Sequence, residues 1–375
     1  SVDRGLPGCR LYEMLHERLI QTRLYLINLT TTTMILHNSP LYAPCAESAV
    51  QSFTFHPFRL KQRCRFCDFT DKALAAELDF RRITPADMPR IWPIIAQECG
   101  RTTDFSYGGL LMWVDYFHYE FAILNNTVFI KGRVESDVSK VAFSLPIGEM
   151  PLEKCVAILH EYCRSQNLQL IFSAVPEYAI VSFAPLRPKQ VEELSGWADY
   201  LYEAEPLVTL RGKKMSKKRN HVNQFLSSYP EYRYEPLTAA NIPDALRFME
   251  LIDAEGDHTP MAETERRLNR DMLRFMADGD SVLQGGMLRD ADGTVLAYTI
   301  GDIKGDTLFI HIEKSLRSVA GGFEMINKCF AQQICQSHPE IRYINREDDA
   351  GDPGLRAAKE SYHPITLLRK YNISM

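Results

Sequence analysis

A dense group of charged side chains follows a short apolar segment near the C-terminus. In residues 343–349, Asn345, Arg346, Glu347 and Asp348 come directly after a predicted strand. Open α/β sheets bind ligands at strand ends, and a carboxylate beside an arginine can be tuned for proton transfer. We therefore predict Glu347 as a catalytic base and the other three as substrate-binding residues. The alternative is a solvated loop that holds an internal ion pair.

A second group of such residues ends the apolar segment 306–313, which reads as a strand. Glu313 is the other candidate for the catalytic base, and His311 and Lys314 would bind substrate if this strand ends on the same side of the sheet. A lone histidine is more often a structural residue whose hydrogen bonds are satisfied.

A loop rich in small residues joins this segment to the predicted helix that begins near residue 322. It contains Arg317, Ala320, Gly321 and Gly322, and Phe323 follows. Small residues allow a tight turn that exposes the amides of a helix N-terminus, and these amides together with Arg317 would bind a phosphate group. Glycine turns before helices are also common where no ligand binds.

The order strand, Arg-x-x-Ala-Gly-Gly, helix resembles the pyrophosphate loop of GNAT acyltransferases. That resemblance implies that residues 317–323 bind the phosphates of the acyl donor. It also implies a role for Tyr362, at the end of a short predicted helix over residues 355–362, where many GNAT enzymes carry a tyrosine that protonates the leaving group. The alternative for Tyr362 is a ring that only packs against the sheet.

A basic segment, residues 211–219, holds six basic residues and no acidic one, and a predicted helix follows it. Such a run is usually a solvated face. In a chain of net charge -5 it more plausibly binds phosphate, whether of CoA, of RNA or of a lipid headgroup. We expect Lys214, Lys218 and Arg219 to assist in binding the donor.

An internal repeat indicates which elements position these residues. Residues 83–89 match residues 237–243, and each copy reads as a strand, a threonine N-cap and an amphipathic helix. In the first copy, Thr84 and Asp87 fit a capping box. Both copies continue with β-rich segments, then a helix (residues 151–165 and 322–337) that leads into an apolar strand.

The repeat predicts two copies of one mixed α/β (α+β) unit, and the resemblance of the loop to that of GNAT enzymes implies that these are two tandem GNAT-like acyl-CoA N-acyltransferase folds. The expected domains are residues 77–205 and residues 206–375, the second of which carries the candidate site. Residues 1–76 lack a persistent helix or strand period and are expected to be a poorly structured or artefactual extension.

Composition limits the functional class. The chain of 375 residues is 45% hydrophobic, with 43 basic and 48 acidic residues, which excludes disorder throughout and argues against a general nucleic-acid coat. Nine scattered cysteines indicate reduced thiols in the cytoplasm, and no transmembrane segment is predicted. The pair Cys64 and Cys67 lacks a second ligand pair, so no metal site is expected.

Four strings, RGKKMSKKRNHVNQF, HIEKSL, YINREDD and LRAAKESYHP, resemble the bacterial family related to the C-terminal domain of phosphatidylglycerol lysyltransferase. The resemblance covers residues 77–375 and implies two tandem GNAT-like domains. Membrane-bound members of that family transfer an aminoacyl group from tRNA to a lipid.

From these observations we predict an acyl- or aminoacyltransferase. Its co-substrate would be acyl-CoA or aminoacyl-tRNA, and its acceptor an amine or hydroxyl of a small molecule or lipid headgroup. Glu313 or Glu347 would act as base and Tyr362 as acid. Two alternatives stay open: a non-catalytic binder of tRNA or another phosphate ligand with a degenerate GNAT fold, and a purely structural protein.

Overall fold

The structure is a computed structural model that describes residues 65–255, 260–279 and 282–375. Contacts divide the chain into the units Ser1–Cys67 and Asp68–Met375, and the second unit contains everything discussed below. Residues 1–64 of the predicted extension, which include Cys64, lie outside the described residues. Helix α2 (Arg65–Ala76) forms the last part of that segment.

The first half of the described chain contributes strands β1 to β7, which all belong to one sheet. Its elements are β1 (Arg81–Arg82), η1 (Pro85–Asp87), α3 (Met88–Ile95), η2 (Thr103–Phe105), α4 (Tyr107–Trp113), β2 (Glu120–Leu124), β3 (Thr127–Val134), β4 (Asp137–Phe143), β5 (Ile147–Gly148), α5 (Leu152–Ser165), β6 (Ile171–Pro176), η3 (Glu177–Ala179), α6 (Ile180–Phe183), η4 (Ala184–Leu186) and β7 (Gln190–Glu193).

The next strand, β8 (Asp199–Glu203), still lies before the boundary predicted near residue 205 and so counts with the first half. The elements of the second half are α7 (Ala204–Thr209), α8 (Ser216–Ser228), β9 (Arg233–Pro236), α9 (Ile242–Glu255), α10 (Pro260–Ala277), β10 (Gln284–Arg289), β11 (Val295–Lys304), β12 (Thr307–Ser315), α11 (Gly322–Ser337), β13 (Tyr343–Asn345), α12 (Pro353–Glu360), β14 (Thr366–Leu368) and β15 (Lys370–Ser374).

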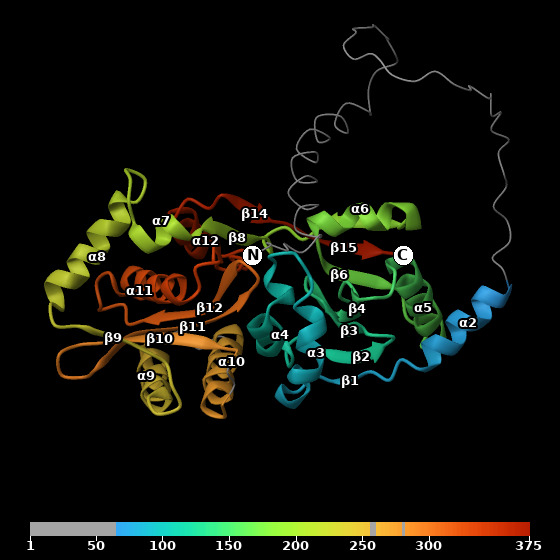
Figure 1. Cartoon of the computed structure of the whole chain (residues 1–375), viewed down its shortest axis with the longest axis horizontal. Coiled ribbons are helices and arrows are strands. Elements are labelled where there is room, and N and C mark those ends of the chain that lie inside the picture. Colours follow the sequence, from blue (N-terminus) through green and yellow to red (C-terminus); the bar gives the residue numbers. More distant parts are fainter. Residues whose placement is uncertain (1–64, 256–259, 280–281) are drawn as a thin grey trace, which may run out of the picture. The chain divides into compact units, whose positions relative to one another are not determined.

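The strands form two mixed sheets, so the predicted mixed α/β class is confirmed (Figure 1). The order in the first sheet is β1-β2-β3-β4-β6-β15-β7, with β5 paired to β3, and the order in the second is β14-β8-β13-β12-β11-β10-β9. In each sheet one parallel pair, β4 with β6 and β12 with β13, interrupts otherwise antiparallel pairing. The two halves therefore repeat one topology.

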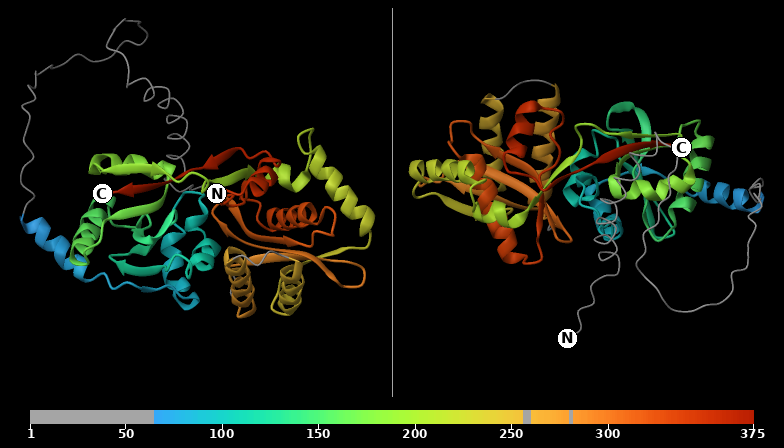
Figure 2. Two further views of the ribbon diagram at one scale, coloured as in Figure 1. Left: turned by 180° about the vertical axis from the view of Figure 1, so that it is seen from behind. Right: turned by 90° about the horizontal axis from the view of Figure 1, so that it is seen from above.

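The two sheets exchange strands. Strand β8 lies between β13 and β14 in the second sheet, although the boundary predicted near residue 205 assigns it to the first domain. Strand β15 ends the chain but pairs with β6 and β7 in the first sheet. Figure 2 shows this red C-terminal segment running from one half into the other. The exchange supplies each parallel pair with an antiparallel neighbour from the other half of the sequence.

The local signals of the repeat appear in the structure. Thr84 and Asp87 form the predicted capping box at the start of the first helical segment. In the second copy the Thr238 amide donates to the Asn241 side chain, 2.7 Å away. In both copies, therefore, the amide of the threonine before the helix donates to the side chain of the residue three positions later.

Helices cover both faces of the second sheet: α9 and α10 lie on one side and α11 on the other (Figure 1). One apolar core contains residues of α3 and α4 together with residues of α9, α10 and β11, so it is shared by both halves. A second core lies between the other face of the second sheet and α7, α8 and α11. A third core belongs to α5 and the first sheet.

Buried ion pairs also join the halves. Lys304 of β11 donates to Glu98, and the two atoms lie 2.6 Å apart with little solvent exposure. The Lys370 ammonium, on the exchanged strand β15, lies 2.8 Å from an Asp104 oxygen and 2.9 Å from an Asp199 oxygen. Asp199 is the first residue of β8, so Lys370 links the two exchanged strands directly.

Among the helices of the described chain, none combines the length and the apolar character that a bilayer crossing requires.

We expect Lys370→Met to destabilise the fold by about 3 to 5 kcal/mol, because it leaves the buried Asp104 and Asp199 carboxylates without a counter-charge. Chemical unfolding measures this loss. The double variant Lys370→Met/Asp199→Asn should regain part of it, since it also removes one carboxylate. Lys213→Met, at an exposed lysine, is the control and should have little effect. Equal stability of wild type and Lys370→Met would contradict the role of this ion pair.

Candidate functional site

A β-bulge in β12 decides where the candidate side chains point. Ile300 of β11 pairs with Ile312, whereas the next residue, Gly301, pairs with Ile310, so His311 is an extra residue in β12. Ile310 packs in the core under α11, and Ile312 packs in the core shared with α4 and α10. Residues two apart in a regular strand would share a face. The bulge therefore reverses the alternation at the end of β12, so that Glu313, which points opposite to Ile312, lies on the same side of the sheet as Ile310.

The strands β12 and β13 separate beside this bulge. Their parallel pairing covers only residues 307–309 and 343–345. Beyond it, Glu347 adopts a left-handed backbone conformation with φ of 57°, and its carbonyl accepts a hydrogen bond from the Tyr200 amide. Residues 346 and 347 stay hydrogen-bonded to Tyr200 of β8 but no longer pair with β12, so the ends of β12 and β13 diverge. We refer to this divergence of the two strand ends as the opening.

Arg346 crosses the opening and binds Glu313. Its Nε and Nη2 atoms donate to the same Glu313 oxygen, Oε2, at 3.0 and 2.7 Å. Both side chains are nearly buried, with 13% and 11% of their surface exposed. Arg346 Nη1 and Glu313 Oε1 are buried without a hydrogen-bond partner. The bound pair thus keeps one unpaired donor and one unpaired acceptor, and each is costly to bury unless a ligand satisfies it.

Tyr362 forms the next part of the same site. Its buried ring lies 4.5 Å from the Arg346 guanidinium and 3.9 Å from the Lys218 ammonium. Burial raises the pKa of the Tyr362 phenol well above its ordinary value, and the positive charge of Arg346 offsets only part of this effect. Tyr362 therefore keeps its proton at neutral pH.

Helix α8 covers the start of α11. A Cβ atom added to Gly321 would lie 2.0 Å from the His221 carbonyl oxygen, and Gly321 has φ of 74°, so only glycine fits there. In the first turn of α11, the Glu324 carboxylate lies 3.2 Å from Lys218 and 2.9 Å from the His221 ring. Burial raises the pKa of Glu324, but His221, Lys218 and a backbone amide lower it overall. A protein carboxylate thus occupies the helix N-terminus.

The remaining residues predicted to bind the donor lie around this contact. Arg317, Ala320 and Phe323 are exposed, and Gly322 is buried against Ser315. The Lys214 side chain is exposed, while Arg219 donates to the backbone carbonyls of Leu210 and Gly212. Of the three basic residues predicted from residues 211–219, only Lys218 reaches Tyr362.

His311 lies on the other side of the strand ends, between two carboxylates. Its Nε2 atom is 2.5 Å from Asp302 and its Nδ1 atom is 2.8 Å from Glu347. Burial alone would lower the pKa of His311, but the hydrogen bonds to Asp302 and Glu347 raise it to about 10. The side chain has no exposed surface, so it reaches a substrate only through Glu347.

The first half of the chain holds this group in place. Asp302 accepts hydrogen bonds from the Gly108 and Tyr107 amides at the start of α4, at 2.8 and 3.3 Å. Asn345 accepts from the Glu347 amide at 2.6 Å and donates to Asp199 at 3.0 Å. Glu347 is therefore positioned by contacts from β11, β12, β8 and α4.

Two further predicted residues take other positions. Lys314 forms an ion pair with Glu265 of α10, on the side of β12 away from Arg346. Burial raises the pKa of Asp348 to about 6. The negative charges of Asp199 and Glu347 also raise this pKa, and the positive charge of Lys370 lowers it in part. No cluster of His, Cys, Asp or Glu in the described residues has the geometry of a metal site.

Comparisons with known proteins agree with this architecture. Residues 97–374 match the family model described as "Phosphatidylglycerol lysyltransferase, C-terminal". The chain belongs to this family. A conserved protein of unknown function from Bacteroides thetaiotaomicron is 30% identical, with a TM-score of 0.71 over 80% of this chain and 99% of that one.

More distant members and neighbours share the fold. The L-PGS structure from Bacillus licheniformis is 12% identical with a TM-score of 0.54, and covers 78% of this chain and 91% of that one. FemX is 8% identical with the same TM-score, 0.54. An uncharacterised Mycoplasmoides gallisepticum protein is 22% identical over 178 residues, which span 56% of its length and 47% of this chain. The predicted family and tandem GNAT-like fold are confirmed, and the family supports an acyltransferase-like function.

Several residues of the candidate site carry no local signal in the sequence. Asp302, Asp199, Lys370 and Glu324 were not predicted, because each acts through partners more than eight positions away. Asp302 lies among mostly apolar residues of β11, and in the sequence it cannot be told from any other polar residue of a strand. Only the contacts of the folded chain reveal its role.

Stability should depend on pH through His311. The pKa of this residue is about 10 in the folded chain and about 6.5 in the unfolded chain, so the stabilisation is complete below about pH 6.5. It is lost as the pH rises through 10. We expect the free energy of unfolding to fall between pH 7 and pH 10, and the difference between wild type and His311→Gln to narrow over that interval.

Urea unfolding at several pH values measures this effect, with His338→Gln as the control, because His338 is a partly exposed surface residue near Glu340. If the difference in the free energy of unfolding between wild type and His311→Gln stays constant from pH 6 to pH 10, His311 is not charged in the folded chain.

Proposed function

We propose that this protein is an aminoacyltransferase that moves an acyl group from an oxygen ester, such as that of aminoacyl-tRNA, to an amine or hydroxyl acceptor. The observation that carries the proposal is the strand opening. There the unpaired Arg346 Nη1 and Glu313 Oε1 lie beside a buried, protonated Tyr362. A donor, an acceptor and an acid in one opening are the groups that acyl transfer requires.

The unpaired atoms match the reacting groups. Glu313 Oε1 takes the proton of the acceptor amine or hydroxyl as its nitrogen or oxygen bonds to the carbonyl carbon of the ester. The carbonyl oxygen gains negative charge, which the Arg346 Nη1–H stabilises in a site with little water. Arg346 is already held by Glu313 through its other two nitrogens, so little reorganisation is needed.

The second half of the reaction falls to Tyr362. The tetrahedral intermediate collapses with cleavage of the bond between the carbonyl carbon and the leaving oxygen, and that oxygen takes the phenolic proton of Tyr362. A phenol whose pKa is raised by burial gives its proton readily only to a strong base. An alkoxide is such a base, whereas a thiolate is far weaker. This difference favours an oxygen ester over a CoA thioester.

The covered helix N-terminus favours the same donor. Glu324 and α8 occupy the start of α11, where the predicted loop would hold a pyrophosphate. The exposed basic residues of the segment 211–219 lie next to the opening instead: His363, which follows Tyr362, contacts the Lys214 backbone carbonyl at 3.3 Å. We infer that this surface contacts the phosphates of a tRNA acceptor end.

Glu347 is the alternative base. One of its oxygens is 2.8 Å from His311, and 18% of the side chain is exposed. In this proposal, His311 and Asp302 are positioning residues for Glu347, and Asn345 holds its backbone. The rates of aminoacyl transfer by Glu313→Gln and Glu347→Gln distinguish the two assignments, because loss of the catalytic base lowers the rate more.

Donor binding tests the proposal first. We expect the full chain to bind a mixture of aminoacyl-tRNAs at least tenfold more tightly than the same tRNAs deacylated, because Arg346 and Glu313 contact the aminoacyl group. The triple variant Lys213→Ala/Lys214→Ala/Lys217→Ala should weaken the binding of both the aminoacylated and the deacylated tRNAs. It should also reduce the steepness of the plot of log affinity against log salt concentration by about 2 to 3. Equilibrium binding from 50 to 200 mM salt gives both values.

Acetyl-CoA is the comparison ligand for this measurement, with Arg317→Ala as its control variant. Tight acetyl-CoA binding that Arg317→Ala abolishes would indicate that the donor is a thioester and not an oxygen ester. Equal affinity for aminoacylated and deacylated tRNA would favour the non-catalytic tRNA binder. Absence of binding to either ligand would overturn the proposal.

Transfer of a radiolabelled aminoacyl group tests the roles of the side chains. Glu313→Gln and Tyr362→Phe should each lower the rate constant by about 10² to 10⁴, with donor affinity changed less, because proton transfer is lost and contact area is kept. Tyr229→Phe is the matched control, since Tyr229 packs partly buried in the same core. Full activity of Tyr362→Phe would exclude it as the acid.

A further inference from the structure

Thr299 of β11 lies directly across the strand pair from Glu313. The register of β11 and β12 places the two residues opposite each other, beyond the bulge at His311. Residues paired in this way point to the same face of a sheet, with Cβ atoms about 4.5 to 5.5 Å apart. That face is the one under α11, because Ala297, two residues before Thr299, belongs to the core beneath that helix. The Thr299 hydroxyl is therefore a neighbour of the Glu313 carboxylate.

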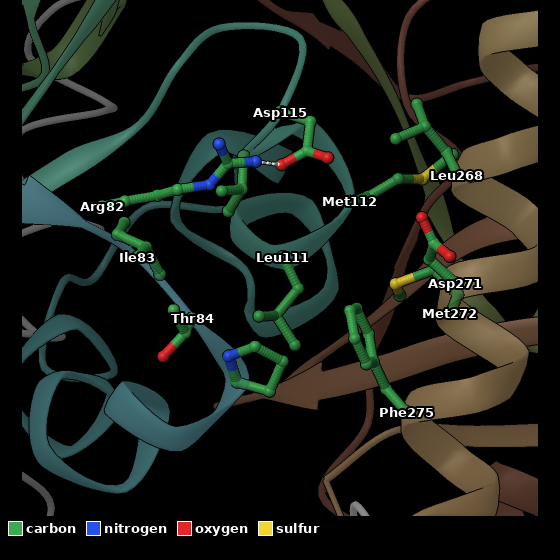
Figure 3. Close-up of a pocket in the computed structure, with 12 residues that line it drawn as sticks. Arg82, Ile83, Thr84, Leu111, Met112, Asp115, Leu268, Asp271, Met272 and Phe275 are labelled. Carbon is green, nitrogen blue, oxygen red and sulfur yellow. Dashed lines mark hydrogen bonds and ion pairs between the residues drawn. The ribbon is translucent and has the colours of Figure 1, made fainter.

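The residues on either side of Thr299 point to the opposite face. Tyr298 and Ile300 belong to the core shared with α4 and α10, to which Leu111 and Met272 also contribute. Figure 3 shows Leu111 and Met272 on these two helices. An apolar core thus covers the opposite face, whereas Thr299 stands beside the charged side chains of the opening.

Thr299 is buried, and its hydroxyl makes no contribution to the hydrogen bonds of the fold. None of the residue is exposed, and Oγ1 has no hydrogen-bond partner among the described residues. Glu313 Oε1 is buried without a partner as well. Valine has nearly the shape of threonine and would fill this place in a strand without leaving a polar group unpaired. Two neighbouring unpaired oxygens are costly unless one bound group contacts both.

Hydrogen-bond geometry limits what that bound group is. A hydrogen bond to oxygen spans about 2.7 to 3.2 Å, so one nitrogen or oxygen atom bridges two oxygens that lie up to about 6 Å apart. The bridging atom must donate to Glu313 Oε1, because a carboxylate only accepts. A primary amine has a second N–H for Thr299 Oγ1, and its lone pair stays free. An alcohol has one O–H, so Thr299 would have to donate to its oxygen, which draws electron density away from the attacking atom.

We propose that Thr299 is a substrate-binding residue and that the acceptor is a primary amine at the end of an unbranched chain. The amine nitrogen donates one N–H to Thr299 Oγ1 and the other to Glu313 Oε1. The unbranched chain follows from burial: 11% of the Glu313 side chain is exposed and none of Thr299, so only a narrow group reaches both. This inference rests on the proposed function, in which Glu313 is the base, and it narrows the class of acceptor.

Thr299 exchanges no proton in the transfer step. The lone pair of the neutral amine forms the bond to the carbonyl carbon of the ester, and Glu313 Oε1 takes one of the two N–H protons. The bond to the leaving oxygen breaks, and that oxygen takes the proton of Tyr362, which yields an amide and a free hydroxyl. After the products leave, the proton on Glu313 returns through solvent to the Tyr362 phenolate. Thr299 acts by holding the second N–H, which orients the lone pair toward the ester.

Transfer from radiolabelled aminoacyl-tRNA to three small acceptors tests the proposal. The acceptors are propylamine, N-methylpropylamine and 1-propanol, and each rate is corrected for the rate without protein. We expect the full chain to use propylamine at least about tenfold faster than the other two, because only propylamine has two N–H groups. The two amines have similar basicity, so their comparison isolates the second N–H.

Substitution of Thr299 separates the effect of its hydroxyl from that of its shape. Thr299→Val should lower the rate with propylamine about 10- to 100-fold and leave the rate with 1-propanol within about threefold, because one hydrogen bond to the amine is lost. Thr299→Ser keeps the hydroxyl and should retain the rate with propylamine within about threefold. Thr102→Val is the matched control, since the Thr102 hydroxyl is also buried and unpaired but lies at the start of η2 in the first half. Its rate with propylamine should stay within about threefold of wild type.

Urea unfolding without ligands gives a measurement that does not depend on transfer. Thr299→Val and Thr102→Val should both raise the urea concentration at the midpoint, because each removes a buried hydroxyl that has no partner. A lower midpoint for Thr299→Val would mean that this hydroxyl has a structural partner, and would overturn the proposal.

The remaining outcomes distinguish this inference from the proposed function. Equal rates with propylamine and 1-propanol, both abolished by Glu313→Gln, would overturn the primary amine and leave the proposed function intact. A Thr299→Ser variant as slow as Thr299→Val would show that the hydroxyl is not the group that matters, and would overturn the role of Thr299. Transfer by wild type to none of the three acceptors would overturn the proposed function and this inference with it.

Discussion

The ion pair between Lys370 and Asp199 supports both the fold and the candidate site. These residues begin the two strands that the sheets exchange, so their contact fixes where the chain crosses from one half to the other. The burial of this ammonium group would lower its pKa, but Asp104 and Asp199 raise it well above the ordinary value. An arrangement of the strands that separated this ammonium group from both carboxylates would leave a buried charge unpaired, which is strongly destabilising.

The candidate site follows from that arrangement. Asp199 accepts hydrogen bonds from the Thr103 amide at 2.6 Å and from Asn345, and Asn345 in turn holds the amide of Glu347. The left-handed turn at Glu347 begins the departure of the chain from β13. Arg346 is thereby directed across the gap between the strands, where it binds Glu313. One buried polar network therefore connects the strand exchange, the turn and the opening.

The site also differs from a simple phosphate loop. Glycine at 321 serves a close contact with α8, and the helix N-terminus that the glycines expose is neutralised by Glu324. The positive charge near the opening comes from Lys218 and from exposed lysines in the turn before α8. This distribution is the reason why the proposed function assigns a large anionic donor on the surface and not a compact pyrophosphate held by backbone amides.

The sequence by itself determined the features that depend on neighbouring residues. The capping box at Thr84, the helix Gly322–Ser337 and the repeated order of elements were predicted because their signals lie within a few positions of one another. The repeat predicted two copies of one α/β unit, and the resemblance to GNAT enzymes and to the lysyltransferase family implied their fold. Glu313 and Arg346 were singled out at strand ends and Tyr362 through the GNAT resemblance. The catalytic roles of Glu313 and Tyr362 and the binding role of Arg346 stay predictions.

Only the tertiary structure decided which of these residues meet. The bulge at His311, the exchange of β8 and β15, and the pairing of Arg346 with Glu313 depend on contacts between residues tens to hundreds of positions apart. Such contacts leave no periodic pattern in the chain, because a buried Asp302 or Lys370 reads like any other polar residue until its partners are known. The free energy that places them comes from burial of charge and apolar surface by the whole fold, which no local segment specifies.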